Sequence, residues 1–171
     1  NNIVQEEGKE LVLNSLNEGR GVILFTPHIG NIEVLVSYIS ENFKCTIPYT
    51  PAKILSLDLL IKHARTLMGA KMVRANSGGV KSLLETLRKG NLVLMASDQV
   101  PQKKHGVISN FFGTPALSVS LISSLATRTK CPCHTVTCLR IKGGKGYKII
   151  FSEKISELNS LNIQEGVNLM N

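Results

Sequence analysis

The sequence predicts an α/β domain with a largely parallel central sheet flanked by helices. Short apolar runs typical of buried strands alternate with longer segments whose apolar residues recur at helical spacing. Near the end, two strand-like runs are separated by Gly143-Gly144, which indicates an antiparallel hairpin added to the parallel strands. The 171 residues have room for one domain with a core, and no repeat or linker-like stretch divides them, so we treat residues 1–171 as a single domain.

The individual elements follow from these patterns. In the first part of the chain we expect helices at 4–16, 31–41, 55–68 and 80–89, and strands at 21–26, 44–49, 71–73 and 92–96. In the rest we expect a polar loop at 98–106, a strand at 107–111, a helix at 117–129 and a hairpin formed by 133–141 and 147–151. Active sites of such sheets gather beyond the carboxyl ends of the strands. His28 and Asp98 each follow a predicted strand closely, so we expect both side chains at the same edge.

The charge balance favours acidic partners. Twenty basic and twelve acidic residues give a formal net charge of +8, which suits nucleic acid, an anionic membrane surface, a phosphorylated substrate or an acidic carrier protein. Nucleic-acid-binding domains usually combine basic clusters with stacking aromatic residues. Aromatic residues make up only 5% here and tryptophan is absent, so we expect no nucleic-acid partner and keep a basic nucleic-acid-binding domain as the alternative outside enzymes.

A cluster of thiols admits two interpretations. Cys131, Cys133 and Cys138 lie on either side of His134, which suggests a zinc site. The paired C-x-x-C motifs of common zinc sites are missing. The segment also fits a β-strand whose small thiol side chains pack as apolar groups. We favour the strand with reduced cysteines and expect neither a metal nor an organic cofactor.

The stretch from Phe25 to Glu33 carries the clearest chemical signal. His28 lies where a predicted strand passes into a helix, and Glu33 lies about one turn inside that helix. A carboxylate that orients a histidine, which then takes a proton from a hydroxyl, is a general-base dyad. The backbone N–H groups of Gly30 and Asn31, at the helix start, would hold an oxyanion. The same pattern also fits a structural histidine and an ordinary helix-capping glutamate.

The segment HIGNIE resembles the H-x4-D/E signature of glycerolipid-type acyltransferases, in the form HxGNxE of the late acyltransferases of lipid A biosynthesis. Further stretches resemble that family in order and spacing: Ser97-Asp98-Gln99, the sequence NFFGTPA at 110–116, LATRT at 125–129 and GKGY at 144–147. Together they span residues 21–151, and they imply a glycerolipid-acyltransferase-like fold.

The resemblance also implies roles for single residues. Arg65 and, with less support, Arg74 would hold a phosphate or developing negative charge, although both also fit a solvated surface. Asp98, with Gln99 beside it, would orient a substrate hydroxyl or structure the active-site edge, unless the pair only starts a turn. The segment Phe111-Phe112-Gly113 would line an acyl-chain pocket, although two aromatic residues before a glycine also fit plain core and turn.

The function that the resemblance implies is O-acyl transfer in lipid A and lipopolysaccharide biosynthesis. The donor would be an acyl carrier protein or CoA thioester, and the acceptor a glycolipid precursor at the cytoplasmic face of the inner membrane. A phospholipid or lysophospholipid acyltransferase is the alternative within the class. No apolar run approaches the roughly 18 to 20 residues of a transmembrane helix. Because family members carry an N-terminal anchor and a C-terminal segment, we expect the chain to be a fragment.

Overall fold

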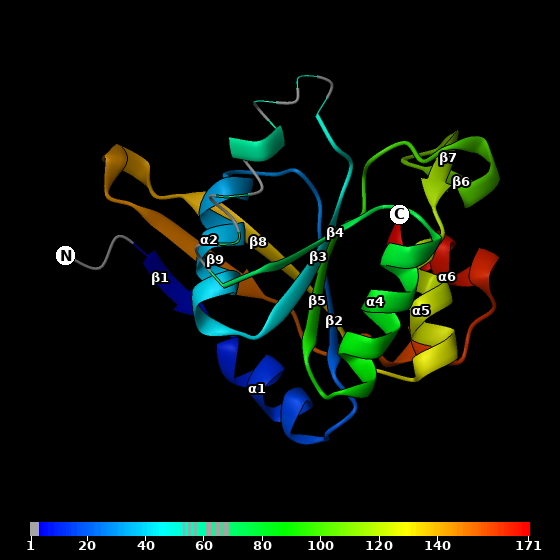
Figure 1. Cartoon of the computed structure of the whole chain (residues 1–171), viewed down its shortest axis with the longest axis horizontal. Helices are drawn as coiled ribbons and strands as arrows, with labels where there is room; N and C mark the ends of the chain where they lie inside the picture. Colours follow the sequence, from blue (N-terminus) through cyan, green and yellow to red (C-terminus); the bar gives the residue numbers. More distant parts are fainter. Residues whose placement is uncertain are drawn as a thin grey trace.

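The computed structural model describes residues 4–171 except residues 53, 55, 57, 61, 62, 64, 65, 67 and 68. In this part of the chain, strands alternate with helices (Figure 1). The strands of the main sheet are β1 (Val4–Glu7), β2 (Val22–Thr26), β3 (Cys45–Tyr49), β4 (Lys71–Arg74), β5 (Leu92–Ala96), β8 (Cys133–Arg140) and β9 (Tyr147–Phe151). The α-helices are α1 (Lys9–Asn17), α2 (Ile32–Asn42), α4 (Ser77–Arg88), α5 (Leu121–Thr129) and α6 (Ile163–Met170).

The main sheet has the order β1-β9-β8-β2-β5-β3-β4. Every neighbouring pair is parallel except β8 and β9, which form an antiparallel hairpin. The predicted α/β class, with a largely parallel sheet and an antiparallel addition, is therefore confirmed. Within the described residues, no helix combines the length and apolar character that a membrane span requires.

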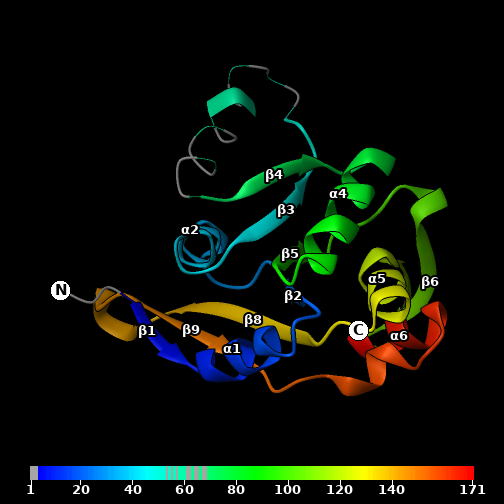
Figure 2. The ribbon, with the colours of Figure 1, turned by 60° about the horizontal axis from the view of Figure 1, so that its bottom comes forward.

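Strand β2 runs through the middle of the core, and all five of its residues are buried. Its side chains alternate between two apolar clusters, as the period of a strand requires. Leu24 packs with residues of α2 and β8, whereas Ile23 and Phe25 pack with residues of α4 and α5. Helices thus cover both faces of the sheet (Figure 2), which explains why the parallel strands read as continuous apolar runs.

The predicted first helix is wrong at its start. Residues Val4–Glu7 form an edge strand that pairs in parallel with β9, and the helix begins only at Lys9. Gly8 separates the two elements with a φ of 76°, a left-handed conformation that a continuous helix cannot contain. The periodicity of the apolar residues extended across this break and hid it.

The predicted helix at 117–129 also begins too early. Residues Gly106–Phe111 and Thr114–Val119 form the antiparallel strands β6 and β7 of a separate hairpin, and α5 starts at Leu121. The hairpin turn consists of Phe112 and Gly113, both with positive φ. A two-residue turn of this kind directs the chain straight back into a paired strand.

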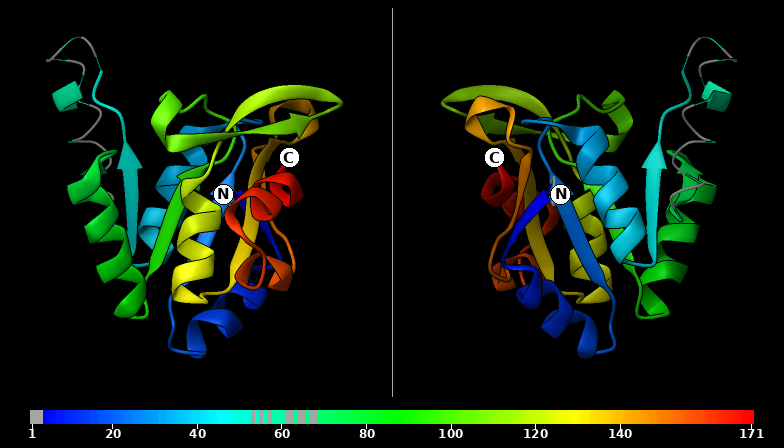
Figure 3. Two further views of the ribbon diagram at one scale, coloured as in Figure 1. Left: turned by 90° about the vertical axis from the view of Figure 1, so that its right-hand side faces the viewer. Right: turned by 90° about the vertical axis from the view of Figure 1, so that its left-hand side faces the viewer.

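The helix predicted at 55–68 lies largely outside the described residues, although residues 56, 58–60, 63 and 66 are helical. The other predicted strands and helices are confirmed within a few residues. The 3-10 segment η1 (Lys103–His105) lies in the predicted loop after β5, and η2 (Lys142–Gly144) closes the β8–β9 hairpin. Figure 3 shows both hairpin tips at one end of the molecule, the end toward which β3 points.

Candidate active site

The candidate site lies at the carboxyl ends of β2 and β5. These neighbouring strands run in parallel with Thr26 opposite Ala96, and the backbone N–H of Ser97 continues the pairing by donating to the Thr26 carbonyl at 3.0 Å. The residues that follow are thereby held side by side. The expectation that His28 and Asp98 meet at one edge is confirmed.

The side chain of Asp98 makes two hydrogen bonds to His28. Its Oδ2 accepts from the backbone N–H at 2.7 Å, and its Oδ1 lies 2.6 Å from the ring nitrogen Nδ1. Partial burial alone would raise the pKa of Asp98, but these two bonds and the charge of the imidazole lower it overall. The carboxylate is therefore ionised near neutral pH and only accepts, so Nδ1 carries a proton and, in the neutral ring, Nε2 presents its lone pair.

The nitrogen Nε2 of His28 faces outward, where a substrate can reach it. The side chain of His28 is 39% exposed, and the amide nitrogen of Gln99 lies 3.4 Å from Nε2. An amide N–H at this position donates weakly to the basic lone pair. A substrate hydroxyl that approaches Nε2 would take the place of this contact.

Glu33 lies in the first turn of α2 and is exposed. The hydrogen bond to Nδ1 that orients the imidazole, which the sequence assigned to Glu33, is made by Asp98 in this structure. The sequence pattern predicted both Glu33 and Asp98 near His28, and Glu33 was assigned the hydrogen bond because it is nearer in the chain. The signal for Asp98 was its position directly after the neighbouring parallel strand. A role for Glu33 in the chemistry itself stays a prediction.

Of the two backbone N–H groups predicted as oxyanion donors, that of Asn31 already makes a hydrogen bond within the fold. The backbone N–H of Asn31 donates to the Cys138 carbonyl at 3.0 Å, and its side chain caps α2 by accepting from the N–H of Val34. The backbone N–H of Asn31 is therefore not available to an oxyanion, and any other role of Asn31 in substrate binding stays a prediction. Gly30 has a φ of 78°, and a Cβ there would lie 1.8 Å from the Cys138 carbonyl oxygen, so only glycine fits. Among the described residues, the N–H of Gly30 has no partner.

Of the two candidate arginines, the structure describes only Arg74. Arg65 lies outside the described residues. Arg74 is exposed at the carboxyl end of β4, and both β3 and β5 lie between it and β2. At about 4.8 Å between strands, this places its backbone roughly 14 Å from that of β2. A contact between Arg74 and a phosphate of a large substrate stays a prediction.

The segment Phe111-Phe112-Gly113 forms the tip of the β6–β7 hairpin. The two rings contact each other edge to face, with centroids 4.8 Å apart, and Phe112 is 88% exposed. A side chain this exposed does not line an enclosed pocket in this conformation. Its contact with an acyl chain stays a prediction.

The comparison with known families agrees with the geometry of this edge. The sequence profile of the bacterial lipid A biosynthesis acyltransferases matches residues 2–171. The chain belongs to this family. A relative from Haemophilus influenzae, named lipid A biosynthesis acyltransferase, is 27% identical over 124 residues. The aligned part covers 72% of this chain and 39% of that relative.

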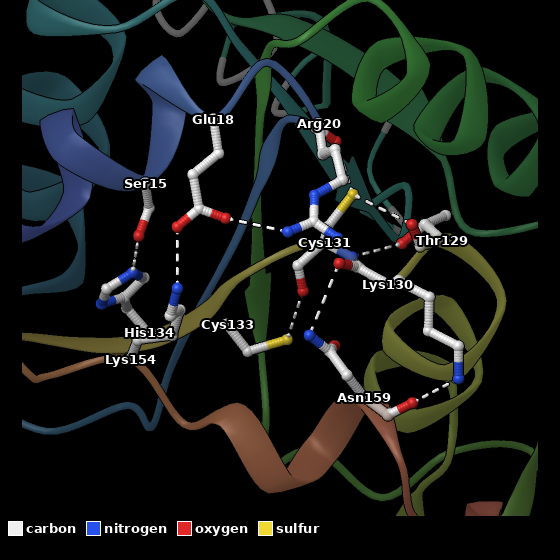
Figure 4. Close-up of polar contacts among 10 residues, drawn as sticks. All are labelled: Ser15, Glu18, Arg20, Thr129, Lys130, Cys131, Cys133, His134, Lys154 and Asn159. Atoms are coloured by element: carbon white, nitrogen blue, oxygen red, sulfur yellow. Dashed lines mark hydrogen bonds and ion pairs between the residues drawn. The ribbon is translucent and has the colours of Figure 1, made fainter.

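In this member of the family, the cluster of thiols around His134 belongs to the core of β8 and its surroundings. Cys133 and Cys138 are fully buried, and both nitrogens of His134 are engaged. Nε2 lies 2.9 Å from the Ser15 hydroxyl (Figure 4), and Nδ1 lies 2.9 Å from the Ser152 carbonyl. A carbonyl only accepts, so Nδ1 donates to it and Nε2 accepts from Ser15. The interpretation of this segment as a strand with apolar thiols is confirmed.

The buried His134 predicts acid sensitivity of the fold. Burial lowers its pKa below the ordinary 6.5, against the opposing hydrogen bond to Ser152. As the pH falls through 6.5, the unfolded chain takes up a proton that the native state does not, so stability falls. We expect urea unfolding at about pH 7.5 and pH 5.5 to show a larger loss of stability in the wild type than in His134→Gln. Equal losses in the two proteins would contradict this role.

Proposed function

We propose that this member of the lipid A biosynthesis acyltransferase family transfers a fatty acyl group to a hydroxyl, with His28 as the general base. The observation that carries the proposal is the contact of 2.6 Å between Asp98 and Nδ1 of His28, which selects the tautomer of the neutral ring whose Nε2 lone pair is available at the exposed edge. A histidine fixed in this tautomer is suited to take a proton from an alcohol.

The proposed reaction has two steps. Nε2 of His28 takes the proton of the acceptor hydroxyl while the oxygen attacks the carbonyl carbon of the acyl thioester. The tetrahedral intermediate then expels the thiolate as the C–S bond breaks, and the imidazolium returns the proton to the leaving sulfur. The products are an ester and a free thiol. Asp98 stabilises the imidazolium between the two steps by accepting from Nδ1.

A donor to the oxyanion of the intermediate is also needed. The N–H of Gly30 is a suitable group because it follows His28 by two residues and its rigid position is fixed by the contact with Cys138. Arg65 would add positive charge if the helix at 55–68 brings it to the same edge. Glu33, at the positive end of α2, would bind or orient a polar part of the acceptor.

The proposal extends to the donor, the acceptor and the location of the reaction. We propose an acyl carrier protein or CoA thioester as donor and a lipid A precursor as acceptor, at the cytoplasmic face of the inner membrane. The name of the Haemophilus influenzae relative supports the pathway. The excess of basic residues supports both an acidic carrier and an anionic surface.

Mass spectrometry of lipid A tests this function. A strain that lacks its late acyltransferase would receive the gene that encodes this chain, in wild-type form or as His28→Ala. We expect the wild type alone to restore a lipid A heavier by one esterified acyl chain. Acylation of a lysophospholipid with no change in lipid A would favour the phospholipid alternative. Salt-sensitive binding to DNA or RNA without thioester turnover would favour the nucleic-acid alternative.

A further inference from the structure

The β6–β7 hairpin is an uncharged structure with an apolar tip. Its fourteen residues, from Gly106 to Val119, contain no acidic or basic side chain. At the tip, Phe112 has a φ of 47°, a conformation that is uncommon for a bulky residue, and its ring is 88% exposed. Ile108 is 62% exposed on the strand that leads to the tip. A phenylalanine is an unfavourable choice for an exposed turn unless something covers it.

The hairpin is fixed at its base and free at its tip. The Asn171 side chain donates to the hydroxyls of Ser109 and Ser118, at 2.9 Å each. Ser109 in turn donates to Asn168 of α6 at 2.7 Å, and Gln164 donates to the Ile108 carbonyl at 2.9 Å. These bonds hold one face of the hairpin against α6. The tip projects beyond them, so its direction is defined by the fold.

Exposed apolar residues gather at the same end of the molecule. Among the described residues, every large apolar side chain that is more than half exposed lies in the hairpin or in a segment that follows β2, β3 or β5. Ile29, next to His28, is 55% exposed, and Val100, next to Gln99, is 80% exposed. A concentration of the most exposed apolar side chains at one end of a molecule indicates an interaction surface.

The positive charge of the chain is concentrated in the segment that contains both hairpins. Between Asp98 and Glu153 lie eight basic residues and no acidic one, whereas the rest of the chain has twelve of each. Lys142 and Lys145 are exposed in the turn of the β8–β9 hairpin. Figure 3 shows this turn and the β6–β7 hairpin at one end of the molecule, and Figure 1 shows them on either side of β2.

We propose that the β6–β7 tip and the β8–β9 turn together dock the enzyme on an anionic lipid surface. Phe112, with Phe111 packed against it, enters the interface between headgroups and acyl chains, where aromatic rings are favoured. Lys142 and Lys145 bind the anionic headgroups beside it. The end of β2 lies between the two contacts, so Nε2 of His28 faces the surface that supplies a lipid acceptor. The inference deepens the proposed function, since it names the surface on which acyl transfer takes place.

The combination of features favours a membrane over an acidic carrier protein. A carrier protein would be matched by the lysines, but it gives no reason for an uncharged hairpin with a projecting phenylalanine tip. An acyl chain alone would be matched by the phenylalanines, but it gives no reason for the basic turn on the other side of His28. A bilayer with anionic headgroups satisfies both, because it offers apolar depth and negative charge in one plane.

Vesicle flotation of the purified protein tests the apolar contact. The decisive variant is Phe112→Asn, because asparagine tolerates positive φ and an Asn-Gly pair is the preferred two-residue hairpin turn. The hairpin is therefore retained while the ring is removed. We expect binding to phosphatidylcholine–phosphatidylglycerol vesicles to weaken about tenfold. The matched control is Leu13→Gln, which removes a 43% exposed apolar side chain from α1 at the opposite end and should leave binding unchanged.

The charged contact is tested with Lys142→Glu combined with Lys145→Glu. Binding to vesicles that contain phosphatidylglycerol should weaken at least tenfold, and binding to phosphatidylcholine alone should change much less. The control is Arg88→Glu combined with Lys89→Glu, which makes the same change of charge at the end of α4 away from the catalytic edge. If the two double variants weaken vesicle binding equally, binding depends only on net charge, and the proposed docking surface is overturned.

Turnover on detergent-dispersed substrates separates this inference from the proposed function. We expect Lys142→Glu combined with Lys145→Glu to keep turnover within about twofold under these conditions. If Phe112→Asn binds vesicles like the wild type but has low turnover, Phe112 contacts the acyl chain instead. If the lysine double variant binds vesicles normally but has a higher KM for the carrier-bound donor, the lysines bind the carrier instead. Either result overturns docking but leaves acyl transfer intact. Vesicle binding that depends on Phe112, in a protein without acyl transfer, would support docking and refute the proposed function.

Discussion

Replacement of His28 by alanine should lower acyl-transfer turnover by roughly two to four orders of magnitude while the fold stays intact. The imidazole is 39% exposed and packs in neither apolar cluster, so its loss leaves no cavity in the core. The backbone N–H of residue 28 remains able to hold Oδ2 of Asp98 in place. The substitution therefore removes the base and little else.

The measurement is thioester turnover beside thermal unfolding. His105→Ala serves as the matched control, since His105 is another exposed histidine, in η1 after β5. Its backbone N–H and carbonyl make hydrogen bonds that an alanine keeps. We expect the control to match the wild type in both measurements. A folded His28→Ala protein with near-normal turnover would refute the general-base mechanism.

The parallel core was predictable because its strands are buried on both faces. Residues 92–96 are a continuous apolar run between a glycine-containing turn and a polar loop, and the strand β5 has these bounds. Edge elements were harder to predict. The four residues of β1 have mostly exposed side chains and gain their conformation from backbone pairing with β9, which leaves almost no pattern in the sequence.

The site shows the same division between local and long-range information. The sequence placed His28 and Asp98 at one edge, because each follows a strand and parallel strands end together. It could not say which carboxylate bonds the imidazole, since that depends on the register of β2 against β5 and on the course of the loop after Thr26. The use of the Asn31 N–H by the Cys138 carbonyl is a contact across 107 residues of chain, and it removed a predicted oxyanion donor.

The second large effect is expected for Asp98→Asn. The carboxylate accepts two hydrogen bonds from His28, one at each oxygen, and an asparagine offers only one oxygen for these two donors. If the amide oxygen keeps the backbone N–H, its NH2 group faces Nδ1, and the proton of the ring moves to Nε2. The base is then blocked, and the negative charge that stabilises the imidazolium is lost as well.

Turnover of Asp98→Asn should therefore fall by roughly two to four orders of magnitude, mainly in kcat. The readout that a purely structural role would not move is the proton NMR signal of Nδ1–H, which should be strongly deshielded in the wild type and absent in the variant. Asp98→Glu keeps the charge on a longer arm and should recover part of the rate. Glu33→Gln is the comparison at the other carboxylate, and it should keep the Nδ1–H signal whatever its effect on turnover. Normal turnover in Asp98→Asn, together with loss of both turnover and signal in Glu33→Gln, would return the orienting role to Glu33.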